Sequence, residues 1–209
     1  MGSTRFYGKV LAPFGNYSLL GWILKRLERL PWQVIVATTI EPKDDDIENF
    51  CIKNRVSYYR GNELDVLDRY YRCALAHGIP NIIRLTGDNP FPDIEMLKKL
   101  ANIHIEQDCD YTHSFGHLPV GVGAEIFKFD ALKRSWENGL MPHHREHVNE
   151  YILENLSQFS ISTISVPTEK NAPNISLTID TEFDYYRIKK LVIDNNLLIS
   201  TEDLIRQIS

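Results

Sequence analysis

Cysteine is scarce in this sequence, and the few cysteines are spread far apart. The 209 residues include three, Cys51, Cys73 and Cys109, with no Cys-x-x-Cys pair. A disulfide framework needs an even number of cysteines in a smaller chain, and a structural zinc site needs closer spacing, so neither is indicated. We expect three buried free thiols in a reducing compartment, and therefore a cytoplasmic protein.

Long apolar runs, an excess of basic residues and a high glycine or proline content are also lacking. No apolar run approaches the roughly 18 residues of a membrane-spanning helix, and residues 1–10 are too polar for a signal peptide. The formal net charge of −5 argues against an electrostatic nucleic-acid binder, although it leaves a local cationic pocket open. The 11 glycines and 10 prolines are too few for a disordered linker protein, so the composition indicates a globular core.

Apolar periodicity is what the sequence does contain, and it alternates between helical and strand-like patterns. Helical spacing occurs at 19–30, from 42 onward, and at 64–77, 93–106, 130–137, 145–156, 182–193 and 201–207. Strand patterns occur at 33–39, 55–60, 81–88, 109–114, 124–130, 159–166 and 176–180. The runs at 33–39 and 81–88 are nearly continuous, which is typical of buried strands. We predict one α/β domain over 1–209, with a mostly parallel sheet, helices on both faces and antiparallel members between 109 and 166.

A basic loop that contains glycine and serine opens the chain. Residues 1–10 (MGSTRFYGKV) combine Gly and Ser amides with the charges of Arg5 and Lys9. Such a combination in front of a helix suits a polyphosphate, although the spacing is not that of a Walker loop. A frayed basic terminus is the alternative interpretation.

Two carboxylates end predicted strands at distant points of the chain. Asp88 ends the pattern at 81–88, and Asp180 ends the one at 176–180. Because ligands bind beyond the carboxyl ends of strands in open α/β sheets, the two could share one magnesium ion. Each could instead form a turn or cap a helix, and Asp93 fits the capping role better than Asp88.

Acidic and histidine clusters elsewhere have plainer interpretations. The acidic trio at 44–46 is expected to be a solvated helix start and not a metal site. His143, His144 and His147 with Glu146 do not form the His-Glu-x-x-His pattern of zinc enzymes. We expect these histidines to cap a helix or to face a ligand rather than to bind zinc.

Six motifs follow one another in an order that resembles a known family. They are MGSTRFYGKVL (1–11), GNELDVLDRYY (61–71), RLTGDNPFPD (84–93), GVGAEIF (121–127), REHVNEYI (145–152) and LTIDTEFDYYRI (177–188). In these motifs the chain resembles the nucleotide-sugar cytidylyltransferases, most closely the spore coat polysaccharide biosynthesis branch, which is related to the acylneuraminate and deoxy-octulosonate cytidylyltransferases. The resemblance implies a Rossmann-like nucleotide-diphospho-sugar transferase fold. It also implies magnesium-dependent transfer of CMP from CTP to a sugar acid or sugar phosphate, with release of pyrophosphate, in surface polysaccharide biosynthesis. It is compatible with a homodimer.

The resemblance further implies roles for individual residues. Those implied to bind the nucleotide are Gly2, Ser3, Arg5 and Lys9 at the triphosphate and Arg60, Gly61 and Asp65 near the cytosine base. Asp88 and Asp180 would hold Mg²⁺, and with Arg5 and Lys9 they would carry catalysis by neutralising charge. The residues implied to face the acceptor sugar are Gly121, Glu125, Arg145, Glu146 and His147. No general base is identified.

Two departures from the family pattern affect these expectations. The family has Leu-Pro where this chain has Phe6-Tyr7, which makes the phosphate loop less rigid. The family also begins with a buried strand that ends in Gln-Ala-Arg before Met-Gly-Ser, whereas Met1 stands inside the motif here. A sheet without its first strand would have an apolar gap and unpaired backbone, so either the start is truncated or misassigned or another segment compensates. We expect a reduced affinity for CTP.

Two other function classes stay open on the sequence alone. One is a non-catalytic nucleotide- or sugar-binding protein of the same fold, for which the absent strand is the argument. The other is a glycosyltransferase that uses a pre-formed nucleotide sugar. The acceptor sugar is not identified, because residues 113–150 contain no diagnostic pattern.

Overall fold

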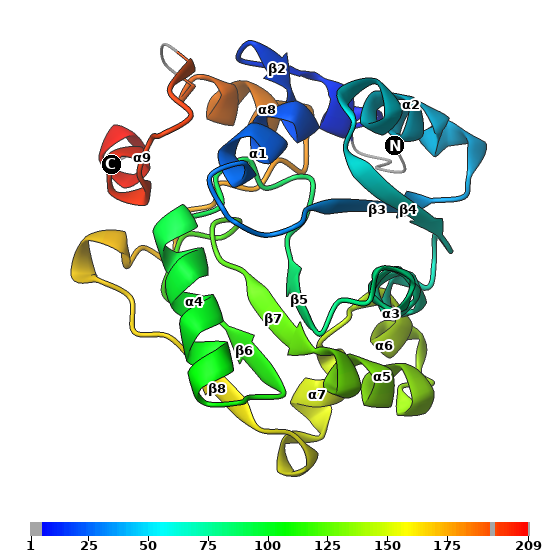
Figure 1. The fold of residues 1–209 in the computed structure, drawn as a ribbon. Coiled ribbons are helices and arrows are strands. Elements are labelled where there is room, and N and C mark those ends of the chain that lie inside the picture. Colours follow the sequence, from blue (N-terminus) through cyan, green and yellow to red (C-terminus); the bar gives the residue numbers. More distant parts are fainter. Residues whose placement is uncertain (1–5, 193–194, 209) are drawn as a thin grey trace.

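The amino-terminal part of the molecule is a short hairpin followed by a buried helix. The computed structural model describes residues 6–192 and 195–208 of the chain (Figure 1). Its first elements are η1 (Lys9–Leu11), β1 (Pro13–Phe14), β2 (Tyr17–Ser18) and α1 (Leu19–Leu27). The Ser18 hydroxyl accepts a hydrogen bond from the Gly21 amide at 3.1 Å, which caps α1 at its predicted start. The helix ends earlier than the predicted 19–30.

Strands β3 and β4 form a parallel pair that is separate from the other strands. β3 (Ile35–Thr39) pairs with β4 (Ser57–Gly61), and Ile35 lies opposite Ser57. The connection runs through η2 (Pro42–Asp44) and α2 (Asp45–Asn54), the helical crossover that parallel strands need.

The acidic trio at the start of α2 is only partly solvated. Asp45 and Asp46 are exposed, as predicted. Asp44 is buried, so the prediction is wrong for this residue. Its carboxylate accepts hydrogen bonds from the hydroxyls of Thr38 and Thr39, at 3.1 and 2.6 Å, and thereby joins the end of β3 to the start of α2.

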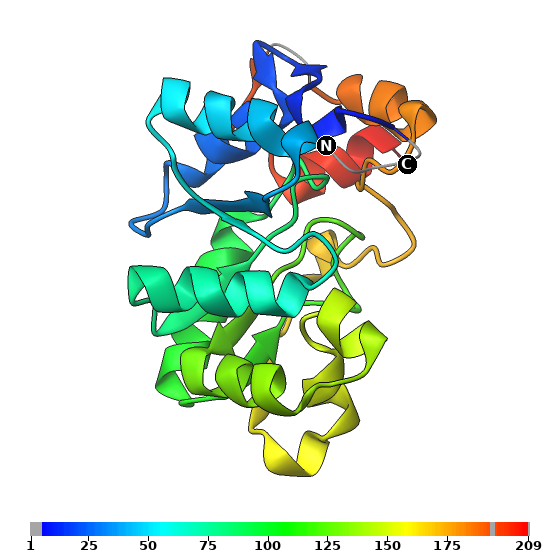
Figure 2. The same ribbon diagram turned by 90° about the vertical axis from the view of Figure 1, so that its right-hand side faces the viewer.

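The largest of the described sheets has four strands in the order β5-β7-β6-β8. Its strands are β5 (Asn81–Arg84), β6 (Tyr111–His113), β7 (Glu125–Lys128) and β8 (Ile161–Thr163). β7 is antiparallel to both of its neighbours and β6 is parallel to β8, so the predicted antiparallel members are confirmed and the sheet is mixed. Helix α4 (Ile94–Glu106) covers one face, and α3 (Val66–His77) and α5 (Phe129–Asn138) cover the other (Figures 1 and 2).

The carboxyl-terminal third departs most from the predicted elements. The helix predicted at 145–156 is divided into α6 (Pro142–Glu146), α7 (Glu150–Glu154) and η3 (Leu156–Gln158). The segment 176–180 is not a strand, because its neighbours are loops that provide one β-bridge, between Ser176 and Val120, and no continuous ladder. The chain continues through η4 (Thr168–Lys170), which precedes that segment, to α8 (Glu182–Lys189) and α9 (Thr201–Ile208).

An apolar cavity of about 870 Å³ lies between β3 and β5. In the described part of the chain, β3 pairs with β4 alone and β5 with β7 alone. Ile35, Val36 and Ala37 are therefore only half-buried, and the predicted burial of 33–39 on both faces is wrong. The physical reason is that all three residues line this cavity.

The cysteines and the helices agree with the expectations from composition. Cys51, Cys73 and Cys109 are free and buried. Burial raises the pKa of the Cys51 and Cys73 thiols to about 11. Within residues 6–192 and 195–208, no helix combines the length and the apolar character that crossing a bilayer requires.

Candidate functional site

Lys9 brings together the two carboxylates that end the predicted strands. Its ammonium donates a hydrogen bond to Asp88 Oδ2 at 3.1 Å and lies 3.7 Å from Asp180 Oδ1. It also donates to the carbonyl oxygen of Ile179 at 2.6 Å. Three loops that are distant in sequence therefore meet at one positive charge. Gly2, Ser3 and Arg5, also predicted here, lie outside the described residues.

The Asp88 loop is ordered by its own side chains. After β5 ends, the Thr86 hydroxyl donates to Asp88 Oδ1 at 2.6 Å and accepts from the Asn89 side-chain amide at 2.8 Å. The loop ends where Asp93 caps α4, since Asp93 Oδ1 accepts from the Met96 amide at 3.0 Å. The predicted capping role of Asp93 is confirmed, and Asp88 is left with 27% of its side chain exposed.

The Asp180 loop places a different residue at the helix cap. Thr181 caps α8, because its hydroxyl accepts from the Asp184 amide at 3.2 Å and the Asp184 carboxylate accepts from the Thr181 amide at 2.9 Å. Burial alone would raise the pKa of Asp184, but these hydrogen bonds lower it. Asp180 is therefore not the cap, and its carboxylate lies beside Lys9 with 43% of the side chain exposed.

The two loops are also joined directly through backbone. The Ile179 amide donates to the carbonyl oxygen of Asp88 at 2.9 Å. Gly121 packs against both loops with φ +88°, and a Cβ there would lie 2.6 Å from Thr178 Oγ1 and 2.8 Å from Asn89 Oδ1. Glycine is required at this position by both the backbone angle and the space.

The donor set at Lys9 fits a hard divalent cation. Asp88 and Asp180 offer carboxylate oxygens on two loops that are partly open to solvent. Oxygen ligands of this kind suit Mg²⁺, which commonly uses one or two carboxylates together with substrate phosphates. Lys9 supplies a positive charge between the same two groups.

The predicted base-binding residue Arg60 is engaged in holding α2 to β4. Its guanidinium donates to the carbonyl oxygens of Thr39 and Glu41, at 2.7 and 2.9 Å. It also pairs with Asp45, at 2.7 Å, and with Glu48. Its role beside a cytosine base stays a prediction, and the open part of this region is the turn that follows β4.

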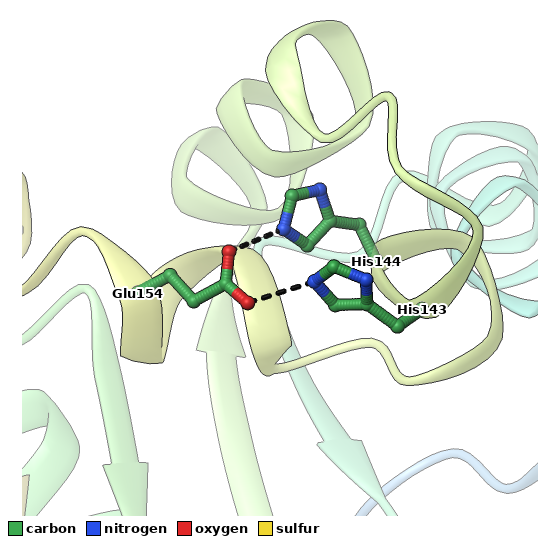
Figure 3. A group of neighbouring side chains, drawn as sticks. All are labelled: His143, His144 and Glu154. Carbon is green, nitrogen blue, oxygen red and sulfur yellow. Dashed lines mark hydrogen bonds and ion pairs between the residues drawn. The ribbon is translucent and has the colours of Figure 1, made fainter.

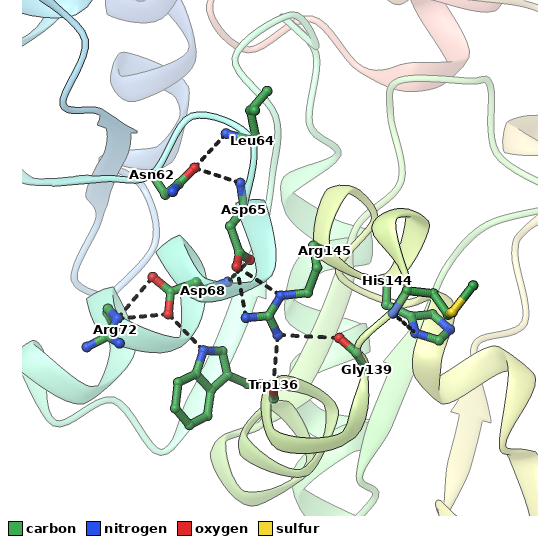
Figure 4. A network of polar contacts seen from close by, with 10 residues as sticks. Asn62, Leu64, Asp65, Asp68, Arg72, Trp136, Gly139, His144 and Arg145 are labelled. Atoms are coloured by element: carbon green, nitrogen blue, oxygen red, sulfur yellow. Dashed lines mark hydrogen bonds and ion pairs between the residues drawn. The ribbon is translucent and has the colours of Figure 1, made fainter.

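Asp65, predicted near the cytosine base, and Arg145, predicted to face the acceptor sugar, form an ion pair (Figure 4). Arg145 Nε and Nη2 lie 2.9 and 2.8 Å from Asp65 Oδ2. Asp65 Oδ1 caps α3 by accepting from the Asp68 amide, and Arg145 also donates to the carbonyl oxygen of Trp136 at 2.8 Å. The pair therefore joins α3, α5 and α6, a contact that sequence spacing did not indicate.

Glu125 lies in the core, where it belongs to a buried polar network. Arg84 and the Tyr111 hydroxyl both donate to its carboxylate, and Asn149 donates to the Tyr111 oxygen at 3.2 Å. Burial, with the nearby Glu125 charge, raises the pKa of Tyr111 above its usual range. Arg84 and Glu125 lie opposite one another in β5 and β7, and only the strand register reveals this pairing.

Glu146 and His147, predicted with Glu125 at the acceptor, are exposed.

His143 and His144 pair with Glu154 of α7 and not with Glu146, the acidic residue next to them in sequence (Figure 3). His143 Nε2 and His144 Nε2 each lie 2.7 Å from one carboxylate oxygen of Glu154. His144 Nδ1 accepts from the Met141 amide at 3.3 Å at the start of α6, which confirms a capping role for this histidine. With Nδ1 accepting, the neutral ring carries its proton on Nε2 and donates it to Glu154.

Comparison with known proteins gives consistent matches over most of the chain. A family model described as cytidylyltransferase matches residues 1–204. The spore coat polysaccharide biosynthesis protein SpsF of Bacillus subtilis is 36% identical over 198 residues, which cover 91% of this chain and 82% of that protein. An uncharacterized protein of Methanocaldococcus jannaschii is 37% identical over 186 residues, or 88% of this chain and 76% of that protein.

A solved structure extends the likeness to the fold. A cytidylyltransferase from Leptospira borgpetersenii serovar Hardjo-bovis superposes with a TM-score of 0.92 at 33% identity, over 100% of this chain and 90% of that chain. The fold class predicted from the sequence, with a Rossmann-like nucleotide-diphospho-sugar transferase fold, is confirmed.

Proposed function

Since the chain belongs to the cytidylyltransferase family, we propose that it transfers CMP from CTP to a sugar acceptor and releases pyrophosphate. The convergence of Asp88, Asp180 and Lys9 carries this proposal. The name of the Bacillus subtilis relative supports surface polysaccharide biosynthesis as the setting. The proposed acceptor is a sugar acid, which would attack through a hydroxyl oxygen, or a sugar phosphate, which would attack through a phosphate oxygen.

The reaction needs charge neutralisation more than it needs a covalent nucleophile. An acceptor oxygen attacks the α-phosphorus, a new P–O bond forms, and the bond to the pyrophosphate oxygen breaks. Lys9 would bind phosphate oxygens, because its ammonium is already placed at the carboxyl edge of the sheet. Gly2, Ser3 and Arg5 would line the triphosphate. Asp88 and Asp180 would hold a magnesium ion, which would neutralise phosphate charge and, with a sugar-acid acceptor, lower the pKa of the attacking hydroxyl.

The turn after β4 is the proposed contact of the cytosine base. Asn62 Oδ1 accepts from the amides of Leu64 and Asp65, at 2.8 and 3.0 Å, so the turn has a defined shape (Figure 4). Since Arg60 is engaged with α2, the backbone from Gly61 to Asp65 would recognise the base.

The proposed acceptor wall begins at Gly121 and includes Arg145. Arg145, which Asp65 and the carbonyl oxygens of Trp136 and Gly139 hold in place, would line this wall with its positive charge. Glu146 and His147, which are exposed nearby in the sequence, would contact the sugar at the rim. Glu125 would act indirectly, by fixing the position of Arg84 and Tyr111.

Pyrophosphate release is the test of this function. Wild type is assayed with CTP and Mg²⁺ against a panel of 2-keto sugar acids and sugar 1-phosphates, and then with the other three nucleoside triphosphates. Turnover is expected with CTP, and Asp88→Ala is expected to lower kcat by at least about 100-fold, the effect of removing one electrostatic group from a transition state.

The matched control is Asp46→Ala, at an exposed carboxylate on α2. It should retain wild-type turnover. Equal activity of Asp88→Ala and Asp46→Ala would refute the assigned role of Asp88. Transfer from a pre-formed nucleotide sugar, with no reaction from CTP, would instead identify a glycosyltransferase.

A further inference from the structure

His143, His144 and Glu154 bring three metal-ligand side chains together where α6 meets α7 (Figure 3). One ligand atom of each residue lies within 4.8 Å of the other two, and each histidine Nε2 is 2.7 Å from a carboxylate oxygen. In a tetrahedral zinc site two ligand atoms are about 3.3 Å apart, because the bonds to zinc are about 2.0–2.2 Å long. Side-chain shifts of less than about 1 Å would therefore admit an ion among these three groups.

The His144 ring is held in place before any ion binds. Its side chain is 7% exposed, and its ring meets the Tyr151 ring edge-on, with 5.4 Å between the ring centroids. Gly139 leaves the room for it, since a Cβ there would lie 3.1 Å from the His144 Cβ. A ligand whose conformation is already fixed loses little entropy when it binds an ion.

The other two groups of the cluster are open to solvent. The side chains of His143 and Glu154 are 43% and 48% exposed. An ion can therefore reach the cluster from bulk water. A water molecule can also complete the coordination, as it does in zinc sites with three protein ligands.

The charge of the cluster also favours a cation. Hydrogen bonds from His144 and His143 lower the pKa of Glu154, so its carboxylate is ionised at neutral pH. Within residues 6–192 and 195–208, no Lys or Arg pairs with this carboxylate. Arg145, the sequence neighbour of His144, pairs with Asp65 instead. The negative charge of Glu154 is thus shared only with two imidazoles, which are metal ligands in their neutral form.

We propose that His143, His144 and Glu154 bind a zinc ion, through Nε2 of each histidine and the carboxylate of Glu154. Imidazole nitrogen suits Zn²⁺, whereas Mg²⁺ prefers oxygen ligands, so the site differs in chemistry from the carboxylate pair at Lys9. The sequence did not indicate it, because the third ligand comes from α7 and not from the neighbouring Glu146.

The ion would join α6 to α7 beside the ion pair that joins α6 to α3. His144 directly precedes Arg145, whose guanidinium pairs with Asp65 at the start of α3. Zinc would therefore brace the short helix α6 from its other side. An ion that binds only the folded chain stabilises it, so Zn²⁺ should raise Tm.

Coordination requires the His144 ring to change its tautomer. Without metal, Nδ1 accepts from the Met141 amide and Nε2 carries the ring proton. When Nε2 binds zinc, the neutral ring carries its proton on Nδ1 instead, and the proton exchanges through solvent without a net release. The bond given up is long, at 3.3 Å, and Met141 is 55% exposed, so water can replace it at the amide.

Isothermal titration of the full chain with ZnCl₂ measures the binding. The protein carries no affinity tag, and millimolar Mg²⁺ is present to occupy oxygen-ligand sites without competing for imidazole. We expect saturable binding of one Zn²⁺ per chain at this cluster. Because no nucleotide is present, a failure of this inference is separate from a failure of the proposed function.

Matched variants locate the ion. His143→Ala and Glu154→Gln, both at exposed side chains, should each weaken zinc binding at least about tenfold, since even the loss of an outer-shell partner costs about 10–100-fold. Zn²⁺ should raise Tm of these variants less than it raises Tm of wild type. His117→Ala removes an exposed histidine outside the cluster, and Asp88→Ala a carboxylate at Lys9, and both should keep the wild-type affinity.

The tautomer of His144 provides a measurement on the wild-type chain. Nitrogen-15 spectra of the imidazole rings should show its proton on Nε2 without metal and on Nδ1 with Zn²⁺. A lack of saturable binding by wild type would overturn the proposal, and so would equal affinities of His143→Ala and His117→Ala. An unchanged His144 tautomer at saturating Zn²⁺ would also overturn it, and this result does not depend on the folding of any variant.

Discussion

Replacing Lys170 by methionine should destabilise the protein strongly, because Lys170 is a buried cation with acidic partners. Its ammonium lies 2.9 Å from Asp93 Oδ2, 2.6 Å from Glu95 Oε2 and 3.7 Å from Glu202 Oε1. The side chains of Lys170 and Asp93 are 4% and 5% exposed. This cluster fixes η4 and α9 to the start of α4, directly after the loop that carries Asp88.

The magnitude follows from what the substitution leaves behind. Removing one partner of a buried ion pair costs about 3–5 kcal/mol, because the other charge stays buried. Asp93 keeps two donors, the Met96 amide at 3.0 Å and the Thr201 hydroxyl at 2.6 Å, so we expect the lower end, about 3 kcal/mol. Glu95 is 74% exposed and adds little. For a chain of this size the loss corresponds to a fall in Tm of about 6–12 °C.

Urea unfolding at pH 7, followed by circular dichroism, measures the loss. Lys128→Met is the matched control, because Lys128 pairs at 2.6 Å with Asp108, which is 83% exposed, and should lose less than about 1 kcal/mol. Adding Asp93→Asn to Lys170→Met should recover part of the stability by removing the stranded charge. The reasoning is refuted if the two lysine variants lose the same free energy, or if the double variant is less stable than Lys170→Met.

Three further predictions concern pH, backbone strain and the nucleotide. Burial lowers the pKa of His104, which is hydrogen-bonded to Thr112 and Asn81, so the folded state resists protonation of this histidine. The free energy of unfolding should therefore fall as the pH drops below about 6.5. The difference between the urea midpoints at pH 7.5 and pH 5.5 should be smaller in His104→Gln than in wild type. Gly121→Ala should cost at least about 1 kcal/mol more than Gly116→Ala in urea unfolding, because both have positive φ but only Gly121 has side-chain atoms in the space of a Cβ. Lys9→Met should weaken CTP binding at least tenfold in isothermal titration with Mg²⁺, and an unchanged affinity would contradict the placement of Lys9 at the triphosphate. The dissociation constant of wild type for CTP should itself lie above about 1 μM, because the edge of β3 that faces the cavity has no strand beside it among the described residues.

Local signals in the sequence predicted the helices that begin and end with clear caps. Asp93 before α4 and Gly78 after α3 mark their boundaries in the chain, and both helices are found where the periodicity places them. The meeting of Asp88 and Asp180 was predicted from strand ends together with the family resemblance. Its geometry agrees, even though 176–180 is a loop, because the Ile179 amide is held by the Asp88 carbonyl.

Features that depend on pairing between distant segments could not be predicted in this way. The register of β5 on β7 sets Arg84 against Glu125, and nothing near either residue in sequence indicates it. Glu146 is close to His143 and His144 in sequence, yet both histidines are hydrogen-bonded to Glu154 of the next helix. The burial of β3 likewise depends on the elements that pack beside it. The apolar run at 33–39 predicts a buried strand, but the run itself does not indicate that a cavity lies at its edge.

The bonds from Lys9 also bear on when the site forms during synthesis of the chain. Lys9 and Ile179 are 170 positions apart, so their contact requires most of the polypeptide to have left the ribosome. A nascent chain that has emerged only as far as α4 would carry Lys9 and Asp88 without Asp180. If the two carboxylates bind the proposed cation, we expect this binding to be a late event in translation, and fragments that end after α4 to be inert toward CTP.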